Sequence, residues 1–297
     1  MWARLRTGAG RLARGVVAIR LCALLPFADS TGVLALAGRL GLWGVGLPLP
    51  AGGIADAVRQ GVRLRDAGVR IVQFSAPHNL ATPDPAARER AVAGLRAAME
   101  VAAAAGAAAV VTEAGHADAA RGAEARVAHP DNLSQAALDR VADTCRQVLD
   151  GAPGGVRLLV EPSVLSPVGS LLRAAEAVRR VAHPAFGIAF DPVQLTTLDN
   201  FFDNGSYLRR SVQQLGTAVG AVHARDVLLH PDGFSYRLAE EPVGQGGLDY
   251  PALLDALAHL DPDVPLCVEQ GGGAAEIESA LGYLRRVAAA QEIALEE

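Results

Sequence analysis

The sequence predicts an α/β fold, a closed (β/α)8 or TIM barrel that forms a single domain. Eight short apolar runs, rich in aliphatic and β-branched residues and bounded by Gly or Pro, are typical of buried parallel strands. Helical segments lie between these runs, and the regular alternation favours a closed barrel over an open sheet. No G-x-G-x-x-G follows the first run, as an open dinucleotide-binding sheet would require. The length of 297 residues suits one such barrel.

The predicted elements follow one another in order along the chain. The expected strands span residues 17–23, 42–47, 69–75, 107–113, 156–161, 186–191, 219–224 and 264–269. The clearest helix is expected from Pro85 to Ala105, with Asp84 as its N-cap and Gly106 as its C-terminal stop. Further helices are expected over 134–149, closed by Gly151, and opening at Ser166-Pro167 and at Asp249-Tyr250-Pro251.

The N-terminal segment MWARLRTGAGRLARG is rich in arginine, lacks acidic residues and precedes an apolar run. A signal peptide has this order, but Arg20 interrupts the run and no small-x-small cleavage site follows promptly. We therefore expect residues 1–15 to be a disordered leader and residues 16–297 to form the barrel, with a targeting peptide as the alternative. No run approaches the roughly 18 apolar residues of a membrane span, so no membrane partner is expected.

Composition excludes several classes of function. The net charge of −5 argues against a nucleic-acid partner, which would favour a basic surface. Cys22, Cys145 and Cys267 form no C-x-x-C, which indicates reduced thiols in a cytoplasmic protein. All 27 basic residues are arginine, so Schiff-base chemistry, a P-loop lysine and a lysine general base are excluded.

Four metal-competent side chains each end one of the last four apolar runs. We call them the quartet: Glu161, Asp191, His223 and Glu269. Because barrel enzymes keep their active sites at the C-terminal ends of the strands, the quartet is expected to face one mouth. Three carboxylates and one imidazole favour one divalent ion, Mn²⁺, Mg²⁺ or Co²⁺, with Zn²⁺ as a further option. The alternative for any one member is a helix cap or an ion-pair partner.

A divalent ion held there would bind adjacent carbonyl and hydroxyl oxygens of a sugar and stabilise an enediolate. Glu161 and Glu269 follow the fifth and eighth strands and would flank such a substrate. One carboxylate would remove a proton and the other return it, which requires a pKa tuned by burial. Both glutamates are therefore candidate catalytic residues.

Several other polar residues follow the predicted strands on the same face. Those singled out as substrate-binding candidates are His78, His116, Gln194 and Arg225. The alternative for the histidines is loop capping. Arg225 shares a strand face with His223, so it would bind an anionic substrate group or pair with a metal-site carboxylate, and we favour the pairing. The long connection over 228–247 would act as a lid or contact another subunit of a homo-oligomer.

The chain resembles the sugar phosphate isomerase/epimerase family of xylose isomerase-like barrels. The resemblance covers about residues 64–284 and rests on VRIVQFSAPHNLATPDPAARERAV, AAAGAAAVVTEAGH, GVRLLVEPSVLSP, FGIAFDPVQL, VHARDV, VGQGGLDYPALLDAL and PLCVEQ. It implies that the quartet binds one divalent metal and that Glu161 and Glu269 form the acid–base pair. Departures from the family pattern are Gln194 for His or Asn, Arg225 for Lys, Gln245 in the frequent G-E-G, and Gln270 for His.

The sequence therefore predicts a metal-dependent isomerase or epimerase acting on a small sugar, sugar phosphate or keto acid. A metal-dependent lyase, similar to an inosose dehydratase, would use the same enediolate. A non-catalytic barrel with a decayed site is a further alternative, favoured by the four departures. A DNA-repair endonuclease on this barrel would need more strand-end histidines and a basic groove.

Overall fold

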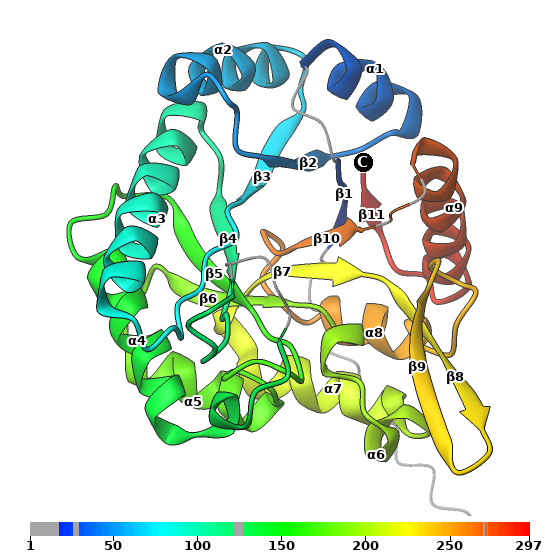
Figure 1. Ribbon diagram of the computed structural model, residues 1–297. Helices are drawn as coiled ribbons and strands as arrows, with labels where there is room; N and C mark the ends of the chain where they lie inside the picture. Colours follow the sequence, from blue (N-terminus) through cyan, green and yellow to red (C-terminus); the bar gives the residue numbers. More distant parts are fainter. Residues whose placement is uncertain (1–17, 26–29, 122–126, 270, 272) are drawn as a thin grey trace, which may run out of the picture.

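Eight parallel strands close into a barrel in the computed structural model, which describes residues 18–25, 30–121, 127–269, 271 and 273–297. The ring closes where β1 (Ile19–Leu24) pairs on one side with β2 (Gly44–Pro48) and on the other with β10 (Pro265–Val268). The other barrel strands are β3 (Arg70–Ser75), β4 (Ala109–Glu113), β5 (Arg157–Glu161), β6 (Phe186–Phe190) and β7 (Val219–Ala224). The predicted closed barrel is confirmed (Figure 1).

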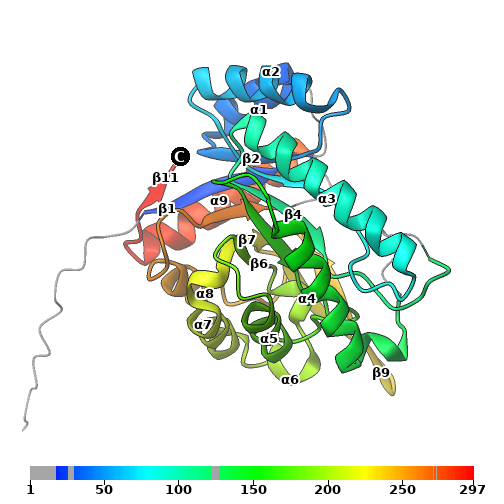
Figure 2. The ribbon, with the colours of Figure 1, turned by 90° about the vertical axis from the view of Figure 1, so that its left-hand side faces the viewer.

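Helices cover the outside of this ring of strands, as Figures 1 and 2 show from two directions. They are α1 (Ser30–Leu40), α2 (Gly53–Asp66), α3 (Pro85–Ala105), α4 (Gln135–Leu149), α5 (Leu171–Val181), α7 (Asn204–Leu215), α8 (Tyr250–Leu257) and α9 (Ala274–Ala290). A single turn, α6 (Leu198–Phe201), precedes α7, and β11 (Leu295–Glu296) adds to the start of β1. The alternation of strand and helix is the one that the apolar runs predicted.

Local capping chemistry accounts for several of the helix boundaries. Asp84 accepts a hydrogen bond from the Ala86 amide, and Gly106 ends α3 at φ +72°, as expected. The expected starts of α4 and α8 are also confirmed, since Ser134 and Asp249 accept amide hydrogen bonds within the first turn.

The helix start expected at Ser166-Pro167 is wrong. The Ser166 hydroxyl accepts from the amides of Ser163 and Val168 and so closes a turn in the loop after β5. The helix begins at Leu171, with Ser170 as its N-cap. Serine offers the same hydrogen bond to a turn as to a helix end, so the sequence alone did not distinguish them.

A β-hairpin occupies most of the segment expected to be a long loop over 228–247. Strand β8 (Asp226–Asp232) pairs antiparallel with β9 (Ser235–Glu241), and the hairpin projects from the end of β7 (Figure 1). Phe234 at its tip is fully exposed.

The core has an outer shell between barrel and helices and a smaller interior inside the barrel. The interior side chains are Ala109, Val111, Leu159, Ala189 and Ala221 in one group and Cys22, Val72 and Cys267 in another. The three cysteines are buried and form no disulfide. The expected leader, residues 1–15, lies outside the described residues, and no described helix is long and apolar enough to cross a membrane.

Replacing Asp84 with Ala is expected to lower the free energy of unfolding by about 1 kcal/mol, because the first turn of α3 loses its cap. Urea denaturation followed by circular dichroism measures the change. Asp84→Ser keeps a capping oxygen and should retain most of the stability. Equal losses in both variants would contradict the capping role.

Candidate functional site

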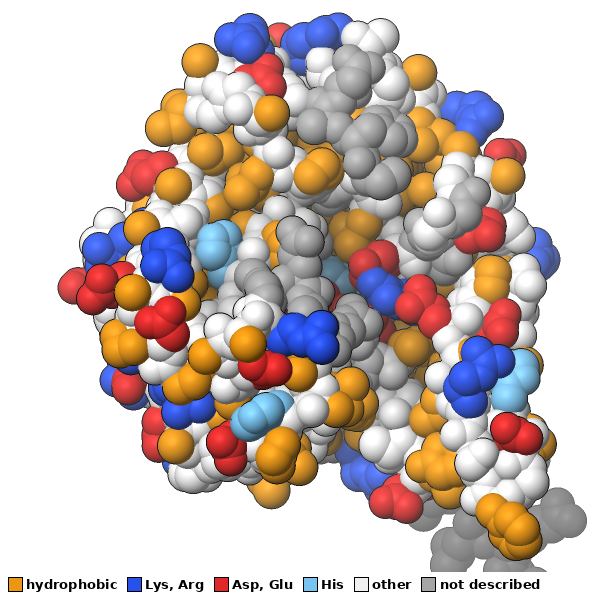
Figure 3. All heavy atoms as spheres, viewed as in Figure 1, with side chains coloured by type: hydrophobic (Ala, Val, Ile, Leu, Met, Phe, Trp, Pro, Cys, Tyr) orange, Lys and Arg blue, Asp and Glu red, His pale blue; other side chains and the backbone are white. Residues whose placement is uncertain are grey.

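The quartet lies at the C-terminal end of the barrel. Glu161 is the last residue of β5, Asp191 and Glu269 directly follow β6 and β10, and His223 is the penultimate residue of β7. The parallel register pairs His223 with Cys267, and the Glu269 amide donates to the Ala224 carbonyl over 3.1 Å. The strand ends therefore bring these side chains to one mouth of the barrel. Figure 3 shows acidic side chains around a basic one at this mouth, near the β8–β9 hairpin.

Three members of the quartet form a compact cluster of ligand atoms. His223 Nδ1 lies 3.2 Å from Glu269 Oε2 and 3.8 Å from Glu161 Oε2. One ligand atom from each of the three residues lies within 4.8 Å of the other two. We call Glu161, His223 and Glu269 the carboxylate–histidine cluster.

The fourth member, Asp191, lies beside the cluster and is not part of it. Its side chain is fully buried, and Oδ1 accepts from the Val193 amide over 2.8 Å. Oδ2 lies 3.3 Å from Arg225 Nε. The structure thus brings three of the four expected ligands together and places the fourth against a guanidinium.

Arg225 connects the acidic groups of the mouth. Its guanidinium pairs with Asp191, with Glu269 and, over 2.8 Å, with Glu240 of β9. The pairing with carboxylates is the arrangement that we favoured from the strand alternation. Glu240 was not identified from the sequence, because its approach depends on the pairing of Val227 with Glu240 in the unexpected hairpin.

Gln73 sets the orientation of the imidazole. Its Oε1 lies 3.2 Å from His223 Nε2, so Nε2 donates this hydrogen bond and Nδ1 faces the two glutamates. Gln73 is fully buried in β3 and was not identified as a site residue. A polar side chain within the apolar run RIVQFS was the available signal, because buried polar groups need a partner.

Each quartet member carries one buried polar atom that makes no hydrogen bond to the described residues. These atoms are Glu161 Oε1, Asp191 Oδ2, His223 Nδ1 and Glu269 Oε2. Buried polar atoms are nearly always hydrogen-bonded, and leaving one unsatisfied costs about 1–3 kcal/mol. Three of the four atoms lie in ion pairs, His223 Nδ1 with Glu269 Oε2 and Asp191 Oδ2 with Arg225, and only Glu161 Oε1 lacks any such contact among the described residues. Once His223 loses its proton, all four atoms offer lone pairs to a positively charged ligand.

Burial and mutual charge perturb the pKa of every member. Burial raises the pKa of Glu161 to about 7 and that of Asp191 to about 6, although His223 and Arg225 oppose these shifts. Burial also disfavours ionised Glu269, but the imidazole and Arg225 outweigh it and lower its pKa to about 2. Burial lowers the pKa of His223, whereas Glu269 and Glu161 raise it, to about 10. His223 is therefore an imidazolium at neutral pH when no metal is bound.

A cavity of about 180 Å³ opens above the cluster. Its wall includes Leu24, Thr112, Glu113, Arg225 and the carboxylate–histidine cluster. This volume corresponds to about six water molecules, so it suits a small polar substrate. We call it the mouth cavity.

The remaining candidates lie at different distances from this cavity. Gln194 lines a narrow recess together with Glu161. His116 is buried against Asn79, whose side-chain oxygen accepts from the His116 amide over 2.9 Å. His78 packs on α3, where a Cβ added at Gly94 would lie 2.3 Å from His78 Nε2. Neither histidine lines the mouth cavity, because both belong to the packing between the loops after β3 and β4 and helix α3.

The motifs H-x-R-D and G-x-G-x-L-D-Y meet in space and hold Arg225 in place. Asp226 accepts hydrogen bonds from the amides of Gly244 and Leu248, at 2.9 and 3.0 Å. The fully buried Tyr250 hydroxyl donates to the Arg225 carbonyl over 2.6 Å. A Cβ added at Gly246 would lie 2.3 Å from Asp226 Oδ1, so only glycine fits there. The two motifs are one structural unit that fixes the end of β7.

A family model described as "Xylose isomerase-like TIM barrel" matches residues 35–287. The chain belongs to the xylose isomerase-like TIM barrel family. No curated protein matches the chain.

Solved xylose isomerase-like barrels share the fold at low identity. D-psicose 3-epimerase from Clostridium cellulolyticum H10, solved with D-tagatose, is 15% identical, with a TM-score of 0.70 over 91% of this chain and 99% of that chain. The IOLI protein with a bound zinc atom is 17% identical, with a TM-score of 0.67 over 92% and 97%. The probable 3-DHS dehydratase AsbF from Bacillus anthracis is 14% identical, with a TM-score of 0.65 over 90% and 99%.

Membership of the xylose isomerase-like family leaves the departures from its usual pattern to be explained. Arg225 stands where lysine is usual, and its planar guanidinium contacts three carboxylates, which a single ammonium would do less well. Gln194 lies at the recess beside Glu161. Gln270 lies outside the described residues. None of these substitutions removes a member of the quartet.

Binding of Mn²⁺ is expected to release protons at neutral pH and to tighten as the pH rises from 6 to 8. The metal-free imidazole of His223 and part of the Glu161 population carry protons, and both groups must lose them to become ligands. Isothermal titration calorimetry in two buffers of different ionisation enthalpy counts the protons released. A pH-independent affinity without proton release would contradict the assigned ligands.

Proposed function

We propose that this protein is a divalent-metal-dependent isomerase or epimerase of a small sugar, sugar phosphate or keto acid. The observation that carries the proposal is the carboxylate–histidine cluster, whose ligand atoms lie within 4.8 Å of one another at the C-terminal end of the barrel. Membership of the xylose isomerase-like family supports it, as does the shared fold with a solved D-psicose 3-epimerase.

The proposed ligands are Glu161, His223 and Glu269, with Asp191 as the fourth. Their oxygen-rich donor set suits Mn²⁺, Mg²⁺ or Co²⁺, and the imidazole also allows Zn²⁺. When bound, such an ion polarises a substrate carbonyl and lowers the pKa of the adjacent C–H. The buried ligand atoms that lack hydrogen bonds support this assignment.

Glu161 and Glu269 are the proposed proton-transfer pair. Glu269 is ionised at neutral pH, so its carboxylate can accept a proton from the carbon beside the carbonyl. Loss of the His223 proton on metal binding would remove the main interaction that lowers the pKa of Glu269 in the metal-free protein. Glu161 has a pKa near 7 and can return a proton, at the same or the adjacent carbon. Return to the same carbon from the opposite side gives epimerisation, and return to the adjacent carbon gives isomerisation.

Arg225 and Gln194 are the proposed substrate contacts. Arg225 lines the mouth cavity and Gln194 lines the recess beside Glu161. Arg225 is held by three carboxylates, so we assign it first to positioning Glu269 and second to an anionic substrate group. His78 and His116 are not included, because neither lines the mouth cavity.

A lyase remains the second candidate function, since a neighbour of the same fold is a probable dehydratase. The same glutamate pair would remove the proton beside the carbonyl, and a hydroxyl would then leave. Product analysis distinguishes the two reactions, because only dehydration releases water.

We expect Glu161→Gln and Glu269→Gln each to lower turnover by at least about 10²-fold, because each removes a proton-transfer group. The assay is a screen of ketoses, inososes and hydroxypyruvate with Mn²⁺, Mg²⁺ or Co²⁺, using NMR in D₂O to follow exchange at the reacting carbon. Glu278→Gln, on the exposed face of α9, is the matched control. Full activity in either site variant with an intact fold would disprove the acid–base assignment.

Removal of metal by a chelator is expected to abolish turnover and to lower the melting temperature, and one equivalent of divalent ion should restore both. Metal analysis of the purified protein gives the stoichiometry. A protein that binds no ion at millimolar concentration would support the alternative of a decayed, non-catalytic barrel.

A further inference from the structure

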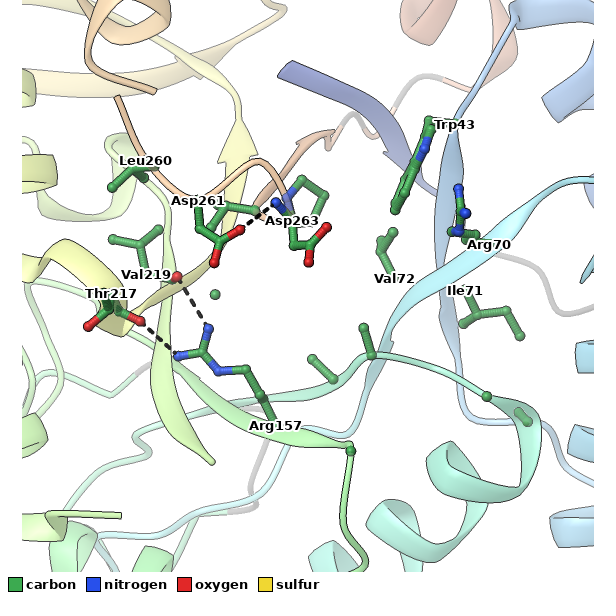
Figure 4. A pocket seen from close by; sticks show the side chains of 18 of the residues that line it. Trp43, Arg70, Ile71, Val72, Arg157, Thr217, Val219, Leu260, Asp261 and Asp263 are labelled. Atoms are coloured by element: carbon green, nitrogen blue, oxygen red, sulfur yellow. Dashed lines mark hydrogen bonds between the residues drawn. The ribbon is translucent and has the colours of Figure 1, made fainter. Parts of the chain in front are cut away.

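A second and larger cavity, of about 770 Å³, lies at the opposite end of the barrel. The first residues of five strands line it, namely Arg70 of β3, Ala109 of β4, Arg157 of β5, Val219 of β7 and Pro265 of β10. We call it the lower cavity, and Figure 4 shows it from close by. Its volume lies in the range of sites that bind metabolites.

The cavity exists because small residues occupy inward positions where large side chains would otherwise fill the barrel. A Cβ added at Gly187 would lie 2.4 Å from Arg157 Nη2. A Cβ added at Gly220 would lie 2.4 Å from Leu159 Cδ2 and 3.1 Å from Arg157 Nη1. The two glycines thus make room for one long cationic side chain in place of an apolar layer.

Arg157 is a partly buried cation that forms no ion pair within 4 Å among the described residues, although the charge of Asp261 acts on it. Its guanidinium donates to the carbonyls of Phe186, Thr217, Ala218 and Val219, each over 3.3 Å. Its buried Nε has no hydrogen-bond partner in the described part of the chain. Burial lowers the pKa of Arg157, which Asp261 only partly opposes. A cation in this position is stabilised by an incoming anion.

A second arginine lies on the facing wall. The guanidinium carbon of Arg70 stands 4.4 Å from the centroid of the Trp43 ring (Figure 4), and that of Arg20 stands at the same distance from this ring. Arg20 and, to a lesser extent, the charge of Arg70 also lower the pKa of Glu296. Arg65 of α2 also lines the cavity. Of the two acidic lining residues, Asp263 is already paired with Arg20, so positive charge exceeds negative charge here.

Much of the rest of the wall is apolar, with Thr217 and His259 as further polar lining residues. Trp43, Ile71, Val72, Leu260 and Val264 face the cavity between the charged groups, and Figure 4 shows several of them across from Arg157. A ligand that fills this space must offer apolar surface as well as negative charge, since inorganic ions alone would leave most of the wall uncovered.

We propose that the lower cavity binds a small organic anion, a carboxylate or phosphate group carried on an apolar or aromatic body. The anionic group lies between Arg157 and Arg70, and the body lies against Val72 and Leu260 beside the Arg70–Trp43 pair. This site is separate from the carboxylate–histidine cluster, and its occupancy does not depend on the proposed isomerase activity.

Trp43 provides a direct test. The chain contains two tryptophans, so Trp2→Phe leaves Trp43 as the sole tryptophan emitter in the full-length protein. Phenylacetate and phenyl phosphate are titrated separately, which distinguishes a carboxylate ligand from a phosphate ligand, with neutral phenylacetamide and inorganic phosphate as comparisons. We expect a saturable change in Trp43 emission with at least one aromatic anion, and binding at least about tenfold weaker for phenylacetamide.

Variants assign the charge contacts. Arg70→Gln and Arg157→Gln should each weaken binding by about tenfold or more, whereas Arg59→Gln, on the exposed surface of α2, should not. If Arg157→Gln fails to fold, the affinity of Arg70→Gln is the deciding measurement, because Arg70 also lines the cavity. Glu161→Gln should leave this binding unchanged. No saturable response to either aromatic anion, or full binding in Arg70→Gln, would overturn the proposal.

Discussion

The requirement to neutralise buried carboxylates governs the upper end of this barrel. Glu161, Asp191 and Glu269 approach one another inside a space largely closed to water, where like charges raise each other's pKa and desolvation adds to the cost. Without a metal, two cations of the chain itself compensate them, the His223 imidazolium and Arg225. A divalent ion would take over the role of the imidazolium, which must then release its proton.

Much of the surrounding architecture serves to hold Arg225 in this position. Asp226 accepts hydrogen bonds from backbone amides of the glycine-rich segment, and the Tyr250 hydroxyl at the start of α8 donates to the Arg225 carbonyl. Glu240 reaches the guanidinium from β9, which connects the hairpin to the site. Because one guanidinium contacts all three acidic partners, the hairpin and the carboxylates form one electrostatic unit. A displacement of Arg225 by metal or substrate would therefore also release the hairpin contact.

Features that depend on local sequence, such as the strands and helices of the barrel, could be predicted. Features that depend on long-range pairing could not. The apolar runs and the caps at Asp84, Ser134 and Asp249 specify elements that close hydrogen bonds within a few residues. The ends of parallel strands share one face, so the position of the quartet was also predictable. The hairpin, the Glu240 contact and the separation of His78 from the mouth depend on long-range packing. Gln73 is the intermediate case, because a buried polar side chain in a strand indicates that it has a hydrogen-bond partner but does not indicate which residue that partner is.

The side chains that β5 places inside the barrel explain how one barrel can offer two unlike sites. Side chains alternate along a strand, so Arg157, Leu159 and Glu161 all face the interior, one above the other. Leu159 is fully buried and packs with small interior side chains, which places a dry layer between the guanidinium at one end and the carboxylate at the other. The Cα atoms of Arg157 and Glu161 are about 13 Å apart along the strand. The C-terminal end of the barrel therefore favours a cation, and the N-terminal end favours an anion.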